Sequence, residues 1–295
     1  TFLHMVNHSL IKLVLFLAAG VIYMNTHALN LNEIRGFGRK KPILKMVFLV
    51  GALAIGGIPG FGGYISKTLI HESIVEYGAT EIMKFVEYVF LFSGGLTVAY
   101  MTKISKAVFF EKNTDPEVQE KFDAKKDYMN PVSAAALTVS AGILLVWGLF
   151  PHQLMDRFAE TAQGFMNFHP HGEPHIVAYF SFVNLKGALI SIVIGVLVYL
   201  FFICKVLVRR QEDTTMYVNL WPKWLDMEYL IYRPVLLQFL PFAGGILCRV
   251  LDSLVDTLVI CLRKTIYKDS PVPREYKVGD GFTRLIGGIL GLHQK

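Results

Sequence analysis

Several apolar runs, each about 20 residues long, constrain this chain more than any other feature, because that is the length of helix that crosses a bilayer core about 30 Å thick. Hydrophobic residues make up 53% of the 295 residues. The charged residues, 18% of the total, gather between the apolar runs. This distribution predicts an all-α, polytopic integral membrane helix bundle rather than a series of soluble domains.

We predict five transmembrane segments, over residues 3–24, 43–72, 85–110, 131–151 and 177–208. The second segment is interrupted by glycines and a proline, including Gly57, Pro59 and Gly60. Such residues break the hydrogen-bond ladder of a helix, and a break inside the membrane is tolerated only where protein or a watery cavity satisfies the freed backbone groups. The broken segment is therefore the first candidate for a functional site.

The basic residues predict the orientation and the division of the chain. Lysine and arginine are frequent in 25–42, in 111–130 and directly after the fifth segment, and rare in 72–84 and 152–175. Because cytoplasmic loops carry the excess of basic residues, the first group is expected in the cytoplasm of a multi-pass protein of the cell inner (plasma) membrane. We predict a transmembrane bundle over 1–210, followed by a cytoplasmic connector, an amphipathic helix and a tail over 211–295.

The apolar segment 234–264 has two interpretations. Arg249, Asp252 and Asp256 recur on it near helical spacing, which indicates an amphipathic helix. A helix lying along the cytoplasmic boundary agrees with the charge rule, because a crossing would place the basic residues that follow on the outer side. A sixth crossing remains the alternative.

Composition and motifs argue against several functional classes. The net charge is +6, but no stretch interleaves basic with aromatic residues on a polar surface, so nucleic acid is not an expected partner. The three cysteines are far apart, and no phosphate loop, iron–sulfur cluster motif or haem motif is visible. We therefore predict no cofactor and no catalytic residue. Because the chain starts at Thr1, next to a transmembrane pattern, we expect an N-terminal part to be missing.

The first segment contains a ladder of ionisable side chains. His4, His8 and Lys12 are successive i, i+4 neighbours and share one helix face. Ionisable residues inside a membrane are costly, so they indicate function by default. Histidine titrates near neutrality, and removal from water favours the neutral form of an amine. The ladder therefore predicts a proton relay.

Other interpretations of this ladder are weaker. His4 near the membrane surface could be only structural, because a polar side chain costs little there. A zinc site would use His4 and His8, but the cationic Lys12 one turn further repels a metal, so no metal is predicted. A membrane enzyme with His8 as general base would need a nucleophile or a metal triad, and only Asn7 and Ser9 are available nearby.

Lys67 follows the helix break and is the second candidate for a proton-holding amine, since broken helices of transporters surround ion sites. A lysine that extends its amine to the membrane surface is the structural alternative. Glu72 could be the counter-charge of Lys67 or an acid at the interface. Lys103, near the cytoplasmic end of the third segment, is either a proton exit or a lysine that reaches the interface in the same way.

Residues 4–111 resemble the second half of the proton-conducting antiporter family. This family includes the large membrane subunits of respiratory complex I, the Mrp-type cation/proton antiporter subunits and their counterparts in membrane-bound hydrogenases. The His-x-x-x-His-x-x-x-Lys pattern of the family matches His4, His8 and Lys12. Its Gly-Ile-Pro-x-x-x-Gly-Phe-x-x-Lys pattern matches 57–67, with Tyr64 in place of the usual Phe. Residues 224–233 are similar to a cytoplasmic motif of Mrp-type and hydrogenase-type members.

The resemblance implies that Lys12 lies on a central hydrophilic axis and that Lys67 is the terminal proton-accepting residue of this half. The family's other half carries a membrane glutamate and another lysine on earlier helices, which are absent here, so one half-channel is predicted. The implied partners are protons, the lipid bilayer and other membrane subunits of a redox-driven or Mrp-type complex, with sodium coupling left open. A scaffold subunit that conducts nothing is the alternative function.

Overall fold

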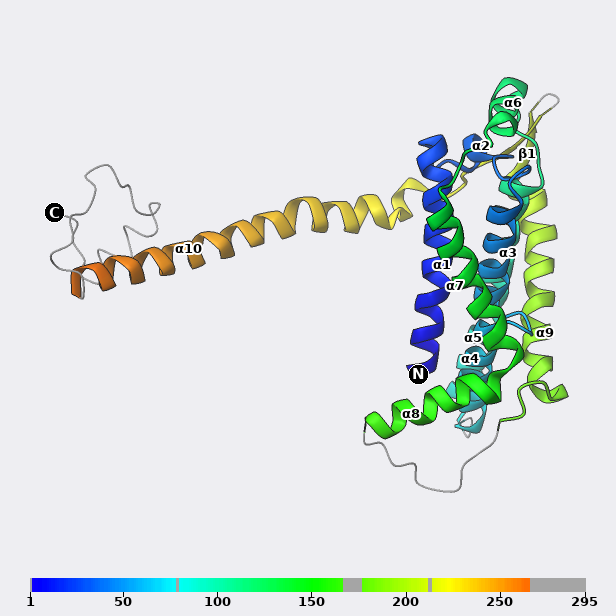
Figure 1. The fold of residues 1–295 in the computed structure, drawn as a ribbon, viewed down its shortest axis with the longest axis horizontal. Helices are drawn as coiled ribbons and strands as arrows, with labels where there is room; N and C mark the ends of the chain where they lie inside the picture. The colour runs from blue at the N-terminus through cyan, green and yellow to red at the C-terminus, as the bar shows by residue number, and fades with distance from the viewer. Residues whose placement is uncertain (1, 78–79, 167–176, 212–213, 266–295) are drawn as a thin grey trace. The chain divides into compact units, whose positions relative to one another are not determined.

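The computed structural model describes residues 2–77, 80–166, 177–211 and 214–265, which divide into two compact units after Asn219 (Figure 1). Unit 1 contains α1 (Phe2–Thr26), α2 (Leu31–Ile34), α3 (Pro42–Gly56), α4 (Gly62–Glu76), α5 (Glu81–Phe109), α6 (Pro116–Ala124), α7 (Pro131–Leu149), η1 (His152–Asp156), α8 (Arg157–Phe165), α9 (Phe182–Leu197), η2 (Val198–Leu207), β1 (Val208–Gln211) and β2 (Thr214–Tyr217). Unit 2 contains η3 (Lys223–Leu225), η4 (Glu228–Tyr232), η5 (Val235–Phe239) and α10 (Leu240–Thr265).

Local sequence signals explain where several helices begin. Pro42, Pro116 and Pro131 each occupy the first turn of a helix, where a missing N–H costs nothing. The side chain of Asn130 accepts a hydrogen bond from the backbone N–H of Ser133 and caps α7, and Asp115 caps α6 in the same way. These caps fix the points at which the connecting segments become helix.

Among the described residues, four helices are long and apolar enough to cross a membrane: Phe2–Thr26, Glu81–Phe109, Pro131–Leu149 and the continuous helix of α9 and η2, Phe182–Leu207. The pair α3 and α4 follows the remaining predicted segment, with its interruption between Gly56 and Gly62. The prediction of a polytopic helical membrane protein is therefore confirmed. The helix α10 is not one of the four, and its course along or across the membrane stays a prediction.

Small residues allow α9 to pack closely against α5. A Cβ atom on Gly95 would lie 2.5 Å from Cγ2 of Ile194, and one on Gly195 would lie 2.8 Å from the carbonyl oxygen of Gly95. The hydroxyl of Ser191 donates to the carbonyl oxygen of Leu91 at 3.0 Å. Small residues and interhelical hydrogen bonds are the usual means of helix association in lipid, where apolar burial gives little advantage.

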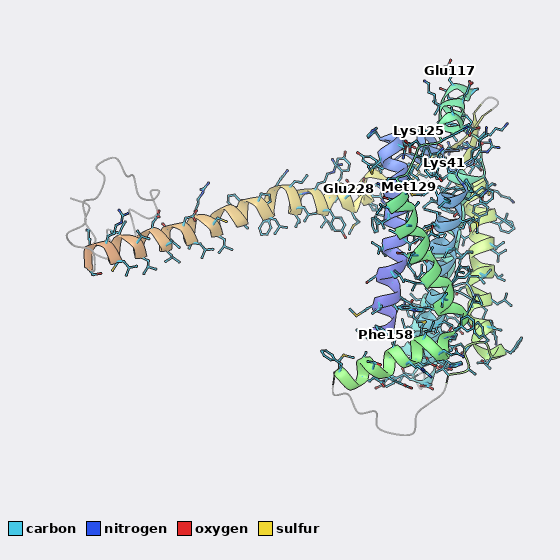
Figure 2. The ribbon with its side chains drawn as sticks, viewed as in Figure 1. Lys41, Glu117, Lys125, Met129, Phe158 and Glu228 are labelled. Carbon is cyan, nitrogen blue, oxygen red and sulfur yellow. The ribbon has the colours of Figure 1, made fainter. Side chains whose placement is uncertain are left out.

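The two ends of unit 1 differ. We call the end that contains α2, α6 and the β1–β2 hairpin the hairpin end, and the opposite end, next to α8, the α8 end (Figure 1). The hairpin is antiparallel and pairs Val208 with Tyr217 and Gln211 with Thr214. Figure 2 shows Lys41, Glu117 and Lys125 at the hairpin end and Phe158 at the α8 end.

Candidate functional site

The helix break ends α3 in a regular manner. Gly57 has φ +75°, in the left-handed region that favours glycine. Its N–H donates to the carbonyl oxygen of Ala54 at 3.0 Å, and the N–H of Ile58 donates to that of Leu53 at 3.1 Å. This pair of bonds is the Schellman motif, which satisfies two of the carbonyl groups left free at a helix end. The carbonyl of Ile55 is not bonded by this motif.

Lys67 occupies the position that the motif leaves open. Its Nζ donates to the carbonyl oxygen of Ile55 at 2.7 Å, so an amine of α4 caps the carboxyl end of α3. A cation is favoured there because the peptide dipoles give a helix carboxyl end partial negative charge. A Cβ atom on Gly57 would lie 2.8 Å from Cδ of Lys67, so this glycine is needed for its space as well as for its φ angle.

The ladder on α1 faces α4. Nδ1 of His4 lies 3.0 Å from Oγ of Ser66, the residue before Lys67. The rings of His4 and His8 have centroids 5.7 Å apart, as expected for neighbours one turn apart. His8 and Lys12 are exposed in this chain, and the Lys12 amine lies 5.9 Å from the centroid of the Phe16 ring.

One cavity of about 240 Å³ joins these groups. Its lining includes the cationic or basic side chains of α1 and α4, together with residues of α3, α5 and α9: His4, His8, Lys12, Lys67, His71, Gly57, Ser93 and Ser191. The described part of the lining contains no aspartate or glutamate. The volume is sufficient for several water molecules, which could connect groups that do not touch directly.

Glu72 and Lys103 lie elsewhere. Nδ2 of Asn184 donates to Oε1 of Glu72 at 3.3 Å, and Glu72 lines a different cavity, next to Ser73 and Glu76. Nζ of Lys103 lies 5.5 Å from the centroid of the Tyr217 ring at the hairpin end. The proposed roles of these two residues as counter-charge or proton exit stay predictions, and neither residue lines the cavity of Lys67.

Tyr64, which stands where the family pattern has Phe, uses its hydroxyl for a contact that Phe could not make. Its hydroxyl donates to the carbonyl oxygen of Tyr179 at 2.6 Å, and its ring is almost fully buried. The hydroxyl of Tyr179 in turn donates to Oδ1 of Asp156 at 2.6 Å. This contact could not be predicted from the sequence, since Tyr179 and Asp156 belong to segments far from Tyr64 in the chain.

Asn7 is a second residue that sequence reasoning missed. It is fully buried on α1, and its Nδ2 donates to the carbonyl oxygen of Gly62, at the first residue of α4, at 2.8 Å. A buried amide bonded to a neighbouring helix fixes the position of that helix. The available signal is an asparagine within an apolar run, which indicates a buried polar contact.

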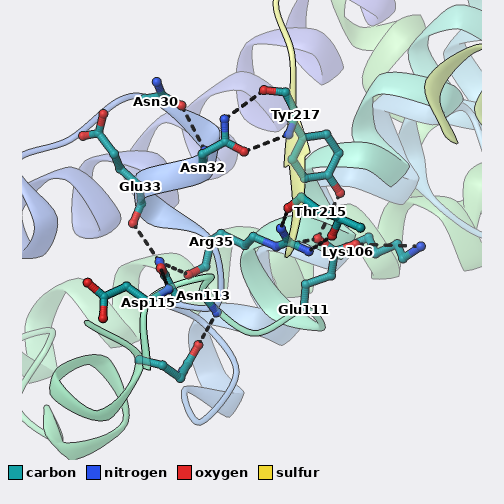
Figure 3. A network of polar contacts seen from close by, with 11 residues as sticks. Asn30, Asn32, Glu33, Arg35, Lys106, Glu111, Asn113, Asp115, Thr215 and Tyr217 are labelled. Atoms are coloured by element: carbon teal, nitrogen blue, oxygen red, sulfur yellow. Dashed lines mark hydrogen bonds and ion pairs between the residues drawn. The ribbon is translucent and has the colours of Figure 1, made fainter. Parts of the chain in front are cut away.

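The hairpin end contains a polar network (Figure 3). Nε of Arg35 lies 2.8 Å from Oε2 of Glu111, and the hydroxyl of Tyr217 donates to the same oxygen at 3.1 Å. The Arg35 guanidinium also donates to the backbone carbonyl and hydroxyl oxygens of Thr215. Burial raises the pKa of the Tyr217 hydroxyl, and the neighbouring carboxylate of Glu111 raises it further. The network joins the hairpin to Arg35 at the end of α2 and to Glu111 just after α5.

Lys41 is buried at the start of α3. Its Nζ donates to the carbonyl oxygens of Phe37 and Phe122 at 3.0 and 2.8 Å and lies 4.2 Å from the centroid of the Phe37 ring. Burial lowers the pKa of this amine. Two of the basic residues predicted to set the orientation, Arg35 and Lys41, therefore also hold the hairpin end together.

Comparison with known proteins finds a family model that matches the first part of unit 1. Residues 1–106 match the family model described as NADH:quinone oxidoreductase/Mrp antiporter, TM. This range includes the ladder on α1, the helix break and Lys67. Residues 1–106 thus match the family that the motifs indicate, and the resemblance inferred from the motifs is confirmed.

Individual relatives come from three kinds of complex. The chain is 36% identical to formate hydrogenlyase subunit 3 of Escherichia coli (strain K12) over 24% of its length, and 36% identical to NAD(P)H-quinone oxidoreductase chain 4 2 of Microcystis aeruginosa over 37%. It is 21% identical to Na(+)/H(+) antiporter subunit A1 of Staphylococcus saprophyticus over 74% of its length. The matches cover 12%, 20% and 28% of these relatives, so the chain spans a minor part of each.

Proposed function

We propose that unit 1 forms one half of a proton-conducting path, in which His4, His8, Lys12 and Lys67 exchange protons through water. The observation that supports this proposal is the cavity that these four side chains line together. Each imidazole can accept a proton on one nitrogen and release it from the other. A lysine amine held away from water, with no carboxylate beside it, releases its proton more readily than a lysine amine that is paired with a carboxylate.

Electrostatic coupling would drive the proton along this path. A positive charge that arrives near Lys12 raises the free energy of its ammonium form and favours release of the proton. Two unit charges about 4 Å apart interact by about 4 kcal/mol at the effective dielectric constant typical of protein. An interaction of this size is sufficient to move a proton between groups of similar affinity.

The exposed side of the ladder needs another protein surface. His8 and Lys12 are exposed in this chain, and ionisable side chains are costly in contact with lipid. We infer that further membrane subunits, or a further part of the same protein, cover this side. Since the named relatives belong to quinone oxidoreductase, hydrogenlyase and antiporter systems, we propose such a multisubunit complex as the host, driven by a redox reaction or by counter-transport of sodium.

The basic loops give the proposed orientation. Arg35, Lys40 and Lys41 lie at the hairpin end, which we place in the cytoplasm of a cell inner membrane, with the α8 end outside. We further propose that residues 1–210 form the membrane bundle and that 211–295 form a cytoplasmic connector and tail. Within this part, 234–264 would lie along the membrane boundary, because the charged residues of α10 disfavour burial in lipid.

The test is proton movement in proteoliposomes that contain the assembled host complex, with Lys67→Met compared with wild type. The variant keeps an unbranched side chain of similar length but has no amine. We expect transport to fall by about tenfold or more, the effect of losing a positioned proton-transfer group. Lys84→Met is the matched control, because Lys84 is an exposed lysine that pairs with Glu81 at the α8 end.

Two results decide between the candidate functions. A loss of transport in Lys67→Met alone, in a complex that still assembles and turns over, supports the relay. Unchanged transport in an assembled complex contradicts it and leaves the chain as a membrane scaffold that conducts nothing.

A further inference from the structure

The cavity continues beyond Lys67 to a histidine that the sequence analysis did not consider. His71 lies one turn after Lys67 on α4 and lines the same cavity. Residues four apart lie on nearly the same face of a helix, whereas residues five apart, such as Lys67 and Glu72, are separated by about 140°. His71 is therefore in line with Lys67 in the direction of the α8 end, and Glu72 is not.

Two neighbouring helices, α5 and α9, hold the His71 ring in place. Its Nε2 lies 3.1 Å from Oε1 of Glu87 on α5. The ring stacks on Phe90 of the same helix, with centroids 5.9 Å apart and an interplanar angle of 12°. On α9, a Cβ atom on Gly187 would lie 3.0 Å from Cε1 and 3.2 Å from Nδ1 of the ring, so the ring packs closely against this glycine.

Glu87 connects this ring to the membrane surface. The side chain of His71 is 15% exposed, and that of Glu87 is 31% exposed. The helix α5 contains 29 residues, so it is about 43 Å long. When centred in a bilayer core about 30 Å thick, it extends beyond the core by several residues at each end. Glu87 is six residues from the start of α5, which places it close to the boundary of the core on the α8 side.

We propose that His71 and Glu87 form the outlet through which a proton leaves Lys67 for the outer surface. The Lys67 ammonium gives a proton, through cavity water, to the free nitrogen of His71, and the imidazole releases its other proton to the Glu87 carboxylate. Glu87 then loses that proton to the outer solution, and Lys67 remains as a neutral amine. One proton leaves Lys67 and one proton reaches the outer solution. His71 ends with its single proton on the nitrogen that faced Lys67, so the ring returns to its first tautomer before the next transfer.

This proposal rests on the proposed relay function. It assigns proton transfer to His71 and proton release to Glu87. An imidazole between an amine and a carboxylate can pass a proton because its two nitrogens alternate as donor and acceptor. A carboxylate at the end of the path can return its proton to water directly, since the Glu87 side chain is 31% exposed. The pair thus provides a direction from the basic cavity to the acidic side chain at the surface.

The experiment measures proton transport by the assembled complex in proteoliposomes for Lys67→Met, His71→Gln, Glu87→Gln and the control Glu81→Gln. Glutamine keeps hydrogen-bonding groups at positions 71 and 87 but transfers no proton. Glu81 is an exposed acid on the same helix, in an ion pair with Lys84. We expect transport to fall about tenfold or more in the first three variants and to stay unchanged in Glu81→Gln.

Chemical rescue separates proton transfer from a structural role. Imidazole added only on the outer side is expected to restore transport to His71→Ala and to leave Lys67→Met inactive. Loss of transport in Lys67→Met together with wild-type transport in His71→Gln or Glu87→Gln overturns the outlet and leaves the relay intact. Wild-type transport in Lys67→Met overturns the relay itself. Failure of rescue in a His71→Ala complex with wild-type thermal stability also overturns the outlet.

Discussion

The cavity around the helix break and the hairpin end of unit 1 both hold cationic side chains away from solvent, but they treat the charge differently. At the hairpin end, Arg35 faces the Glu111 carboxylate, and Lys41 binds two carbonyl oxygens beside an aromatic ring. In the cavity, the described lining offers Lys67 one carbonyl oxygen and several basic neighbours, with no carboxylate. Similar residue types therefore stabilise the fold at the hairpin end, whereas in the relay proposed above they carry exchangeable protons.

The difference follows from the partners rather than from the residue types. A carboxylate beside a cation stabilises the charged form and keeps the proton in place, whereas a neighbouring cation favours its release. An arginine in addition does not lose its proton in proteins. The comparison therefore predicts that substitutions at the break change transport first, and that substitutions at the hairpin end change stability first.

The largest effect is expected from Gly57→Ala. Alanine at φ +75° is strained by about 1–2 kcal/mol, and its Cβ atom would meet Cδ of Lys67 at 2.8 Å. We expect the displaced amine to reduce proton transport about tenfold or more, since small displacements of reacting groups have large effects on rate. The measurement is transport by the assembled complex in proteoliposomes.

Gly20→Ala is the control for this change, because a Cβ atom on Gly20 meets nothing within 4 Å. Equal transport in the two variants would mean that the helix break has no role in proton transport. The predicted difference between the break and the hairpin end would then be wrong.

An intermediate effect, on stability alone, is expected from Arg35→Met. The side chains of Arg35 and Glu111 are 9% and 18% exposed, so the variant leaves a mostly buried carboxylate without its main partner. We expect a loss of about 2 kcal/mol, below the value for a fully buried pair because some solvent reaches it. The measurement is the apparent unfolding temperature in detergent, with transport recorded at a temperature where the complex is folded.

Lys40→Met provides the matched comparison, since the Lys40 side chain is 67% exposed in its ion pair with Asp123. This variant should lose less than about 1 kcal/mol. A loss of transport in folded Arg35→Met would mean that the hairpin end belongs to the proton path and not only to the fold.

The smallest effect is expected from Tyr64→Phe, which restores the usual residue of the family pattern. The variant removes the hydrogen bond from the Tyr64 hydroxyl to the Tyr179 carbonyl oxygen and should cost about 1 kcal/mol, with transport unchanged. Thermal unfolding beside Tyr77→Phe, a change at a tyrosine that is 78% exposed, measures this cost. A clear drop in transport would give the hydroxyl a role in the relay.

Much of this arrangement could be predicted because it depends on local sequence. The lengths of the apolar runs gave the membrane helices, and Gly57 and Pro59 gave the break, since each signal acts through its own backbone. The spacing of His4, His8 and Lys12 placed them on one helix face. The presence of Lys67 after the break was likewise visible in the sequence.

The remaining contacts depend on which helices meet, and sequence periodicity does not contain that information. The partner of Lys67 is a carbonyl oxygen of α3, and the partners of His71 come from α5 and α9. Glu72 illustrates the problem. It is close to Lys67 in sequence, but it points to Asn184 and another cavity. The buried position of Arg35 and Lys41 could not be predicted for the same reason, because the charge of a loop residue does not show which segments cover it.

The hydrogen bond between Lys67 and Ile55 has a consequence for the energy of reorganisation. A charged lysine amine has three N–H groups, and the neutral amine still has two. One of them can remain on the Ile55 carbonyl oxygen while the lone pair left by the departing proton faces the cavity. The side chain then needs no change of rotamer between its two protonation states, and the carboxyl end of α3 keeps its cap throughout. In the proposed relay, a proton would pass this point while the heavy atoms around Lys67 stay where they are.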